Sequence, residues 1–260
     1  MAKIREVQQI IKGHEASDGA SVKFRHYIGY NEQKPHNPFL LFDAFYNNDP
    51  KSYQADSANH SHRDFERVTY LAQGTVEHKD SKENYRKLKS GRAQFITAHS
   101  NSIRSEIPKI DHGLTWGCQL SVNLPSSLKA SEPSHQDIQT EDVPSFGNES
   151  FSAKVLSGKL ADISGPATGF HNIDYFDLRY KINKTLELPI STEKSVILIV
   201  VSGQGSINAR LLQTGDLAIL SDGEVIRLQG EEGFRVIVAA GRPVKEPVAR
   251  YGSFIMQLHH

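Results

Sequence analysis

Short apolar runs rich in β-branched residues constrain the fold of this chain more than any other feature. The run at residues 65–71 ends just before Gly74, and the run at 195–201 ends just before Gly203. Runs of this length, interrupted by glycine about every 8–12 residues, are typical of strands in a β-sandwich or barrel. No long stretch repeats apolar residues with the helical period of about 3.6. The sequence therefore predicts an all-β fold.

A pattern in the first half of the chain recurs in the second. Gly74, between two apolar runs, matches Gly205, and Gly91, at the start of a returning strand, matches Gly215. An internal repeat of this kind indicates two related β-barrels in tandem.

The two predicted barrels are joined by a stretch rich in proline and serine. This stretch occupies residues 124–147, and clusters of such residues are typical of loops between structured segments. We place the boundary near residue 145, which gives an N-terminal barrel over residues 1–145 and a C-terminal barrel over residues 146–260.

Charge and cysteine content exclude several classes of protein. The 30 basic and 30 acidic residues balance, and without a basic excess we expect no direct contact with nucleic acid. Cys118 is the single cysteine, so no internal disulfide can form. The longest apolar run, residues 196–201, is far shorter than the roughly 20 residues of a membrane-spanning helix, and residues 1–12 do not read as a secretory signal. We expect a cytoplasmic protein without a membrane segment.

Two residue pairs with the same spacing are candidates for a chemical site. His60 and His62 are two residues apart, as are Arg104 and Glu106. On a strand, residues at this spacing share a face, and Glu66 keeps the same parity as His62. Imidazoles and carboxylates are suitable ligands for a first-row transition metal ion.

At these residues the sequence resembles the pirins, which are bicupin proteins of the cupin superfamily. The segment 60–71, HSHRDFERVTYL, is similar to the family's HPHRGFETVTYL, and 119–125, QLSVNLP, is similar to LQLWVNLP. Near the end, segments 241–248 and 251–256 are similar to GEPLREPV and GPFVMN. The resemblance runs from about residue 38 to 256, and it implies two tandem cupin-type antiparallel β-barrels, a bicupin.

The resemblance also implies a metal site in the N-terminal barrel, usually occupied by iron and held by three histidines and one glutamate. Carried over position by position, these ligands fall on His60, His62, Arg104 and Glu106. A guanidinium has no lone pair to donate and stays protonated, so Arg104 cannot be a ligand. His60, His62 and Glu106 alone still form the two-histidine, one-carboxylate set that binds Fe²⁺ in many proteins. His99 stands where the family usually has glycine and is a further candidate.

We hypothesise that Arg104 forms an ion pair with Glu106, which leaves the site empty or weakly loaded. A buried arginine without a partner is very costly, and Glu106 is the nearest carboxylate on the same face.

The second barrel is expected to be structural and free of metal. Applying the ligand spacings of the first barrel to Gly205 and Gly215 leads to Ser191, Glu193, Leu228 and Gly230, with no histidine among them.

Two function classes follow from the resemblance, and the sequence leaves enzymatic activity open between them. The first is an iron-dependent dioxygenase of the quercetin 2,3-dioxygenase type, acting on a small aromatic, flavonol-like ligand. In it His60, His62 and Glu106 hold Fe²⁺, and Glu66 takes a proton from the substrate. The second is a non-catalytic bicupin that acts through a protein partner. Arg104 favours the second class, or an altered pocket that binds an anion.

Overall fold

The computed structural model describes residues 2–17, 23–29, 36–47, 65–80, 85–98, 104–107, 115–129, 134–168, 173–245, 248–251 and 254–257. Most of them lie in strands, and each strand ladder among them is antiparallel, so the all-β prediction is confirmed. The helix in these residues, α1 (Ser126–Lys129), has a single turn. No helix in the described part of the chain has the length and apolar character needed to cross a bilayer.

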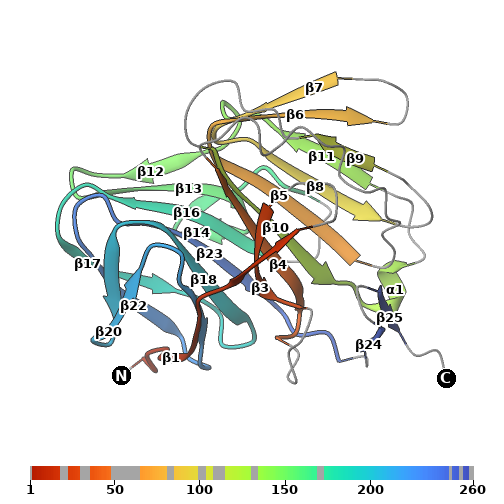
Figure 1. Cartoon of the computed structure of the whole chain (residues 1–260). Helices are drawn as coiled ribbons and strands as arrows, with labels where there is room; N and C mark the ends of the chain where they lie inside the picture. The colour runs from red at the N-terminus through yellow and green to blue at the C-terminus, as the bar shows by residue number, and fades with distance from the viewer. Residues whose placement is uncertain are drawn as a thin grey trace. The chain divides into compact units, whose positions relative to one another are not determined.

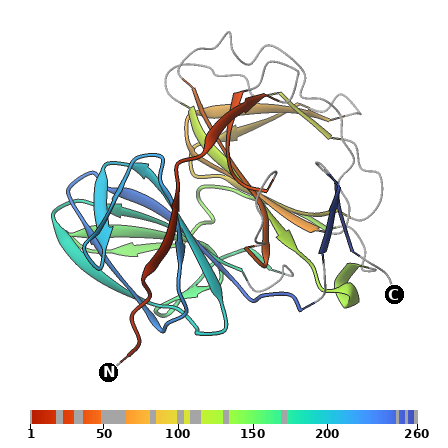
Figure 2. The ribbon, with the colours of Figure 1, turned by 60° about the horizontal axis from the view of Figure 1, so that its bottom comes forward.

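The chain divides into two compact units. Each unit consists of most of one half of the sequence together with a short terminal segment from the other half. The C-terminal unit comprises Met1–Gly13 and Glu141–Pro243, and the N-terminal unit comprises His14–Thr140 and Val244–His260. Figures 1 and 2 show β1, in dark red, beside the strands of the C-terminal unit. The domain limits 1–145 and 146–260 assign each chain end to its own half and remain a prediction. In the structure the middle of the chain divides between Thr140 and Glu141, and Met1–Gly13 joins the C-terminal unit because β1 pairs with β21.

The N-terminal unit contains a seven-stranded and a three-stranded sheet. The larger has the order β11-β8-β5-β10-β4-β3-β2 and the smaller the order β7-β6-β9. The strands of the larger sheet are β2 (His14–Ser17), β3 (Lys23–Ile28), β4 (Phe39–Asn47), β5 (Phe65–Gln73), β8 (Ala93–Ala98), β10 (Thr115–Asn123) and β11 (Ser134–Ile138). The smaller sheet consists of β6 (Thr75–Asp80), β7 (Tyr85–Lys89) and β9 (Arg104–Ile107), and β24 (Val248–Tyr251) pairs with β25 (Phe254–Gln257).

The C-terminal unit repeats this plan with a seven-stranded and a four-stranded sheet. Their orders are β1-β21-β18-β23-β16-β13-β12 and β17-β22-β19-β20. The larger sheet consists of β1 (Val7–Ile11), β12 (Ser145–Gly147), β13 (Phe151–Ser157), β16 (Asp174–Tyr180), β18 (Ser195–Ser202), β21 (Leu217–Leu220) and β23 (Arg235–Gly241). The smaller consists of β17 (Lys184–Pro189), β19 (Gln204–Ile207), β20 (Arg210–Gln213) and β22 (Val225–Gly230), and β14 (Lys159–Leu160) pairs with β15 (Ile163–Ser164).

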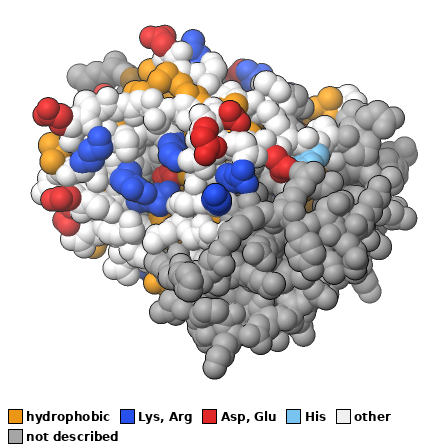
Figure 3. Space-filling view, turned by 90° about the horizontal axis from the view of Figure 1, so that it is seen from above, with side chains coloured by type: hydrophobic (Ala, Val, Ile, Leu, Met, Phe, Trp, Pro, Cys, Tyr) orange, Lys and Arg blue, Asp and Glu red, His pale blue; other side chains and the backbone are white. Residues whose placement is uncertain are grey.

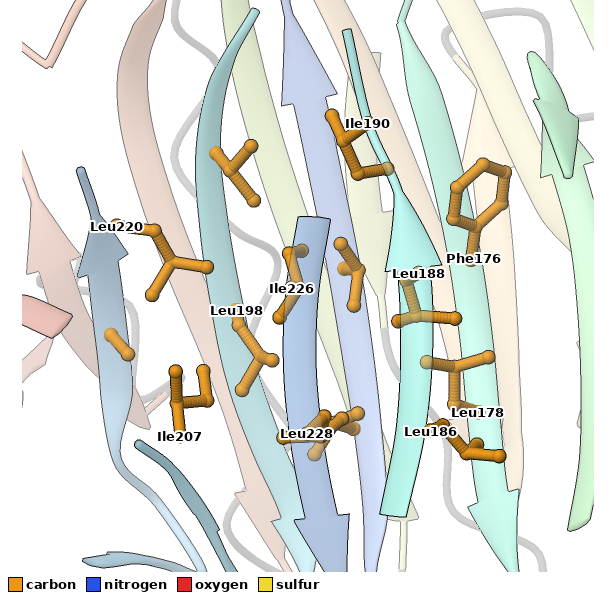
Figure 4. Close-up of a cluster of buried hydrophobic side chains, with 14 of the residues drawn as sticks. Phe176, Leu178, Leu186, Leu188, Ile190, Leu198, Ile207, Leu220, Ile226 and Leu228 are labelled. Atoms are coloured by element: carbon orange, nitrogen blue, oxygen red, sulfur yellow. The ribbon is translucent and has the colours of Figure 1, made fainter. Parts of the chain in front are cut away.

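Apolar side chains from both sheets fill the interior of the C-terminal unit (Figure 4). Along β17 and β22 buried and exposed residues alternate, and Leu186, Leu188, Ile226 and Leu228 point into the core. Strand β18 is instead buried on both faces, which explains why its sequence is continuously apolar rather than alternating. Each such side chain contributes about 1.5–3 kcal/mol to folding.

The internal repeat is confirmed by one hydrogen-bonding pattern that occurs in both units. Leu71 bonds to the backbone of Gly91 and Arg92, and Val200 bonds in the same way to Gly215 and Asp216.

The structure shifts one equivalence of the repeat by two residues. Leu71 and Val200 each lie three residues before a glycine with positive φ, at Gly74 (89°) and Gly203 (75°). Only glycine adopts this conformation without strain, so Gly203, and not Gly205 as predicted, is the counterpart of Gly74. Gly205 lies within β19, where a Cβ atom would clash with the backbone of Gln229.

Arg5 holds the N-terminal segment in the C-terminal unit. Its side chain is completely buried. Nη1 donates a hydrogen bond to the carbonyl of Ser221 (2.9 Å), and Nη2 donates to the carbonyls of Ser191 (2.8 Å) and Lys194 (3.0 Å). One guanidinium thus ties three separate loop positions to residue 5.

We predict that Arg5→Ala lowers the free energy of unfolding of the C-terminal unit by about 3 kcal/mol, because hydrogen bonds from a charged donor contribute about 1.5–3 kcal/mol each and the carbonyls lose their partner. Urea denaturation followed by circular dichroism measures the loss, and hydrogen exchange locates it in β1 and β21. Lys3→Ala, at an exposed position nearby, is the control and should change stability by less than about 0.5 kcal/mol. Equal stabilities of Arg5→Ala and the wild type would contradict the assignment.

Candidate functional site

Glu66 lies on a buried face of the N-terminal unit's large sheet. It is the second residue of β5, its exposed fraction is 2%, and the strand register places it opposite Thr97 of β8 and Val122 of β10. The Thr97 hydroxyl lies 3.2 Å from the hydroxyl of Ser134. The carboxylate therefore sits near the start of β5, four residues after His62 in the sequence.

The other residues on this face of β5, β8 and β10 are uncharged. They are the buried positions that alternate with the polar ones along each strand, namely Val68, Tyr70, Ala93, Phe95, Thr97, Cys118, Leu120 and Val122. Carboxylates are seldom buried in such surroundings unless they have a specific role. Glu66 is thus a buried acid on an otherwise uncharged face of the sheet.

The paired residues Arg104 and Glu106 lie in β9, as their spacing predicts. Strand β9 pairs with β6 so that Glu106 is opposite His78 and Arg104 is opposite Asp80. Directly opposite positions of an antiparallel pair belong to the same face, so positions 78, 80, 104 and 106 share one face of the small sheet.

Sequence reasoning did not identify His78 and Asp80 as members of this group. The signal was present, since the two residues are two apart on a strand that follows the Gly74 turn. What was missing was the register between β6 and β9, which no local pattern reveals.

Three of the predicted site residues, His60, His62 and His99, lie outside the described residues. The described part of the chain brings no three His, Cys, Asp or Glu side chains together in a group that could bind a metal. The residues it does describe, Glu66 on β5 and the backbone of Glu106 on β9, are carboxylate positions on two different sheets of one unit.

The corresponding positions of the C-terminal unit have structural roles. Leu228 belongs to the apolar core, and Gly230 packs against the ring of Tyr180. The hydroxyl of Tyr180 donates to the carbonyl of Leu228 at 2.9 Å, and burial raises the pKa of this tyrosine.

The remaining positions in that unit also lack imidazoles. Counted back from Gly205, the positions that correspond to His60 and His62 are Ser191 and Glu193. Counted back from Gly203, the structural counterpart of Gly74, they are Pro189 and Ser191. The carbonyl of Ser191 accepts a hydrogen bond from Arg5, and Glu193 forms an exposed ion pair with Arg242 at 2.7 Å.

Charges of both signs are interspersed on the described surface that Figure 3 shows. Lys, Arg, Asp and Glu side chains alternate there, and hydrophobic side chains occur in small groups. The described residues on this face thus form no broad patch of one sign.

Two antiparallel barrels in tandem, with the candidate acid in the first and an apolar core in the second, define a bicupin of the cupin superfamily. The family model for Pirin matches residues 21–122, and that for the Pirin C-terminal cupin domain matches residues 175–259. The chain therefore belongs to the pirin family.

Individual relatives are similar over nearly the whole chain. A pirin-like protein of Caulobacter vibrioides is 32% identical, covering 97% of this chain and 93% of the relative. The crystal structure of quercetin 2,3-dioxygenase from Acinetobacter baumannii superposes with a TM-score of 0.88 at 28% identity, covering 98% of this chain and 93% of that one. A bacterial pirin from Escherichia coli in complex with nickel(II) shares the fold, with a TM-score of 0.70 at 19% identity over 91% of this chain and 99% of that one.

We predict that no metal ion will bind to residues 185–235. The positions that would supply ligands there are occupied by core or surface residues such as Leu228 and Glu193. Crystals soaked in Ni²⁺ should show no anomalous peak coordinated by this segment, and Arg104→His crystals treated in parallel provide a positive control in the first barrel. An ordered, protein-coordinated peak within residues 185–235 would refute the prediction.

Proposed function

We propose that this chain is a pirin-family bicupin with a degenerate metal site in its N-terminal barrel, acting as a binding or regulatory protein through a protein partner. The observation that carries the proposal is Arg104, at the position where the family has its third histidine. The donors that remain, His60, His62 and Glu106, fit a divalent first-row metal ion in number and type. The adjacent guanidinium opposes any cation placed among them.

The register between β6 and β9 refines the hypothesis about Arg104. Besides Glu106 two residues away, Asp80 lies directly opposite in the neighbouring strand. A guanidinium between two carboxylate positions competes with a metal ion for both, and it is tethered to the chain whereas the metal must be recruited from solution. We therefore propose that Arg104 pairs with one or both carboxylates and keeps metal loading low.

We predict that purified protein without an affinity tag carries much less than one equivalent of metal, and that Arg104→His raises iron or nickel uptake towards one equivalent. Elemental analysis after incubation with the metal, together with the metal-induced rise in melting temperature, measures both. Arg227→His, on an exposed residue paired with Glu187, adds a histidine elsewhere and should leave uptake unchanged. A full equivalent of tightly held metal in the wild type, or no gain in Arg104→His, would overturn the proposal.

The second candidate function is a metal-dependent dioxygenase of the quercetin 2,3-dioxygenase type. It is favoured by the similarity to the Acinetobacter baumannii enzyme of that name over 98% of this chain. The metal, when bound, would supply Lewis acidity and the reaction with dioxygen. The chain's own contribution would be Glu66, whose buried carboxylate can take the proton of a flavonol hydroxyl.

For this candidate we predict that metal-loaded protein consumes quercetin and that Glu66→Gln lowers kcat by about 10²-fold or more with little change in KM, as expected for a lost general base. Metal content measured on the same samples should be unchanged, which separates a proton acceptor from a ligand. Glu187→Gln, an exposed carboxylate on β17, is the matched control. If fully loaded wild-type and Arg104→His proteins both leave quercetin intact, the dioxygenase function is excluded and the binding function stands.

A further inference from the structure

Two histidines lie beside each other on the large sheet of the N-terminal unit, on strands that carry none of the ligands discussed above. His14 of the edge strand β2 is directly opposite His26 of β3, and His26 is in turn opposite Asp43 of β4. Three residues distant in sequence thus form one row across three neighbouring strands.

The side chains in this row are in contact. The imidazole rings of His14 and His26 lie with centroids 5.6 Å apart at an interplanar angle of 62°. Nδ1 of His26 is hydrogen-bonded to Oδ1 of Asp43. The side chains of His26 and Asp43 are 14% and 16% exposed, whereas His14 is open to solvent. The row therefore runs from a half-buried carboxylate to an accessible imidazole.

The bond to Asp43 determines which nitrogen of His26 can bind a cation. When neutral His26 donates Nδ1–H to the carboxylate, the lone pair of the ring is on Nε2. Histidines that ligate metals usually donate their other nitrogen to a carboxylate in this way, which fixes the tautomer and makes the ring more basic.

We propose that His14 and His26 together bind a divalent transition metal ion, with Asp43 as the residue that positions His26. Two neutral imidazoles, with water in the other coordination positions, suit Cu²⁺ best among the divalent first-row ions, and Ni²⁺ and Zn²⁺ less well. Because His14 is exposed, we expect its side chain to be free to turn a ring nitrogen towards the same ion. This site is independent of His60, His62 and Glu106.

The same unit offers a matched comparison at His135. Its Nε2 lies 3.0 Å from Oδ1 of Asp137, and the two side chains are 26% and 22% exposed. In the strand pairing of the described residues, Ile96 is opposite His135, so the register places no second imidazole across from this histidine. His135 and Asp137 therefore match His26 and Asp43 in having a histidine bound to a carboxylate at similar exposure, but they lack a counterpart of His14.

The test uses full-length, untagged, metal-free protein titrated with CuCl₂. We expect wild-type protein to bind one more equivalent of Cu²⁺ than His14→Ala, and His135→Ala to bind as many as the wild type. The electron paramagnetic resonance spectrum of that extra copper should show hyperfine coupling to two imidazole nitrogens. Asp43→Asn should keep both nitrogens but weaken binding by about 10–100-fold, and unchanged melting temperatures show that the variants remain folded.

Two results would overturn the proposal. One is equal Cu²⁺ binding by the wild type and His14→Ala. The other is an equal loss in His14→Ala and His135→Ala, which would indicate binding by any exposed histidine. All variants retain His60, His62, Glu106 and the terminal residues His259 and His260, so their contribution cancels, and neither result bears on the function proposed above.

Discussion

The burial of the Glu66 carboxylate, which removes a charge from water, is a physical constraint on the N-terminal unit. Glu66 is 2% exposed on a face that is otherwise uncharged, and an ion buried in this way costs several kcal/mol unless hydrogen bonds or an opposite charge compensate it. Glu66 has an interaction in the structure that offsets part of this cost. The hydrogen-bonding pattern that aligns Leu71 with Val200 makes Glu66 the counterpart of Ser195, and it makes Arg67 and Thr69 the counterparts of Val196 and Leu198. Val196 and Leu198 belong to the apolar core of the C-terminal unit, so the first barrel has polar residues where the second has apolar ones.

Fold and chemistry are separable in this chain. Most of the length is similar to relatives at about 30% identity, and the superposition with one of them is close. The pairing that brings β9 beside β6 is made by backbone hydrogen bonds, which every residue other than proline can form. Family membership therefore fixes the architecture and leaves the reaction open, because the reaction depends on individual side chains such as the one at position 104.

The fold could be predicted from sequence because its main signals are local. Glycine after short β-branched runs marks the ends of strands at Gly74 and Gly203 alike, and the backbone bears this out with positive φ at both. The two-residue error in aligning the repeat arose because residues 203–205 contain two glycines. The sequence does not distinguish these two glycines. Only the backbone conformation shows that Gly203 forms the turn and that Gly205 is packed inside a strand.

The candidate site was less predictable because it depends on pairing between distant strands. The spacing of Arg104 and Glu106 is visible in the sequence, but their neighbours His78 and Asp80 follow only from the register of β6 and β9. The row from His14 to Asp43 is equally hidden, since none of its members is close to another in the chain. Register is set by loop lengths and by the burial of whole faces, and a local pattern does not contain that information.

The exchange of chain ends has a consequence for how this protein is made and how it can be divided. The first 13 residues belong to the unit that is completed late, and residues from Val244 onward belong to the unit that begins first. The backbone amide of Val244 donates to the side chain of Asn37 at 2.8 Å, which joins two segments of the N-terminal unit that are 207 residues apart in the sequence. The C-terminal unit is therefore complete once Pro243 is added, whereas the N-terminal unit still lacks the segment from Val244 onward. A cut between the halves would yield two fragments that each lack a segment, rather than two self-sufficient domains.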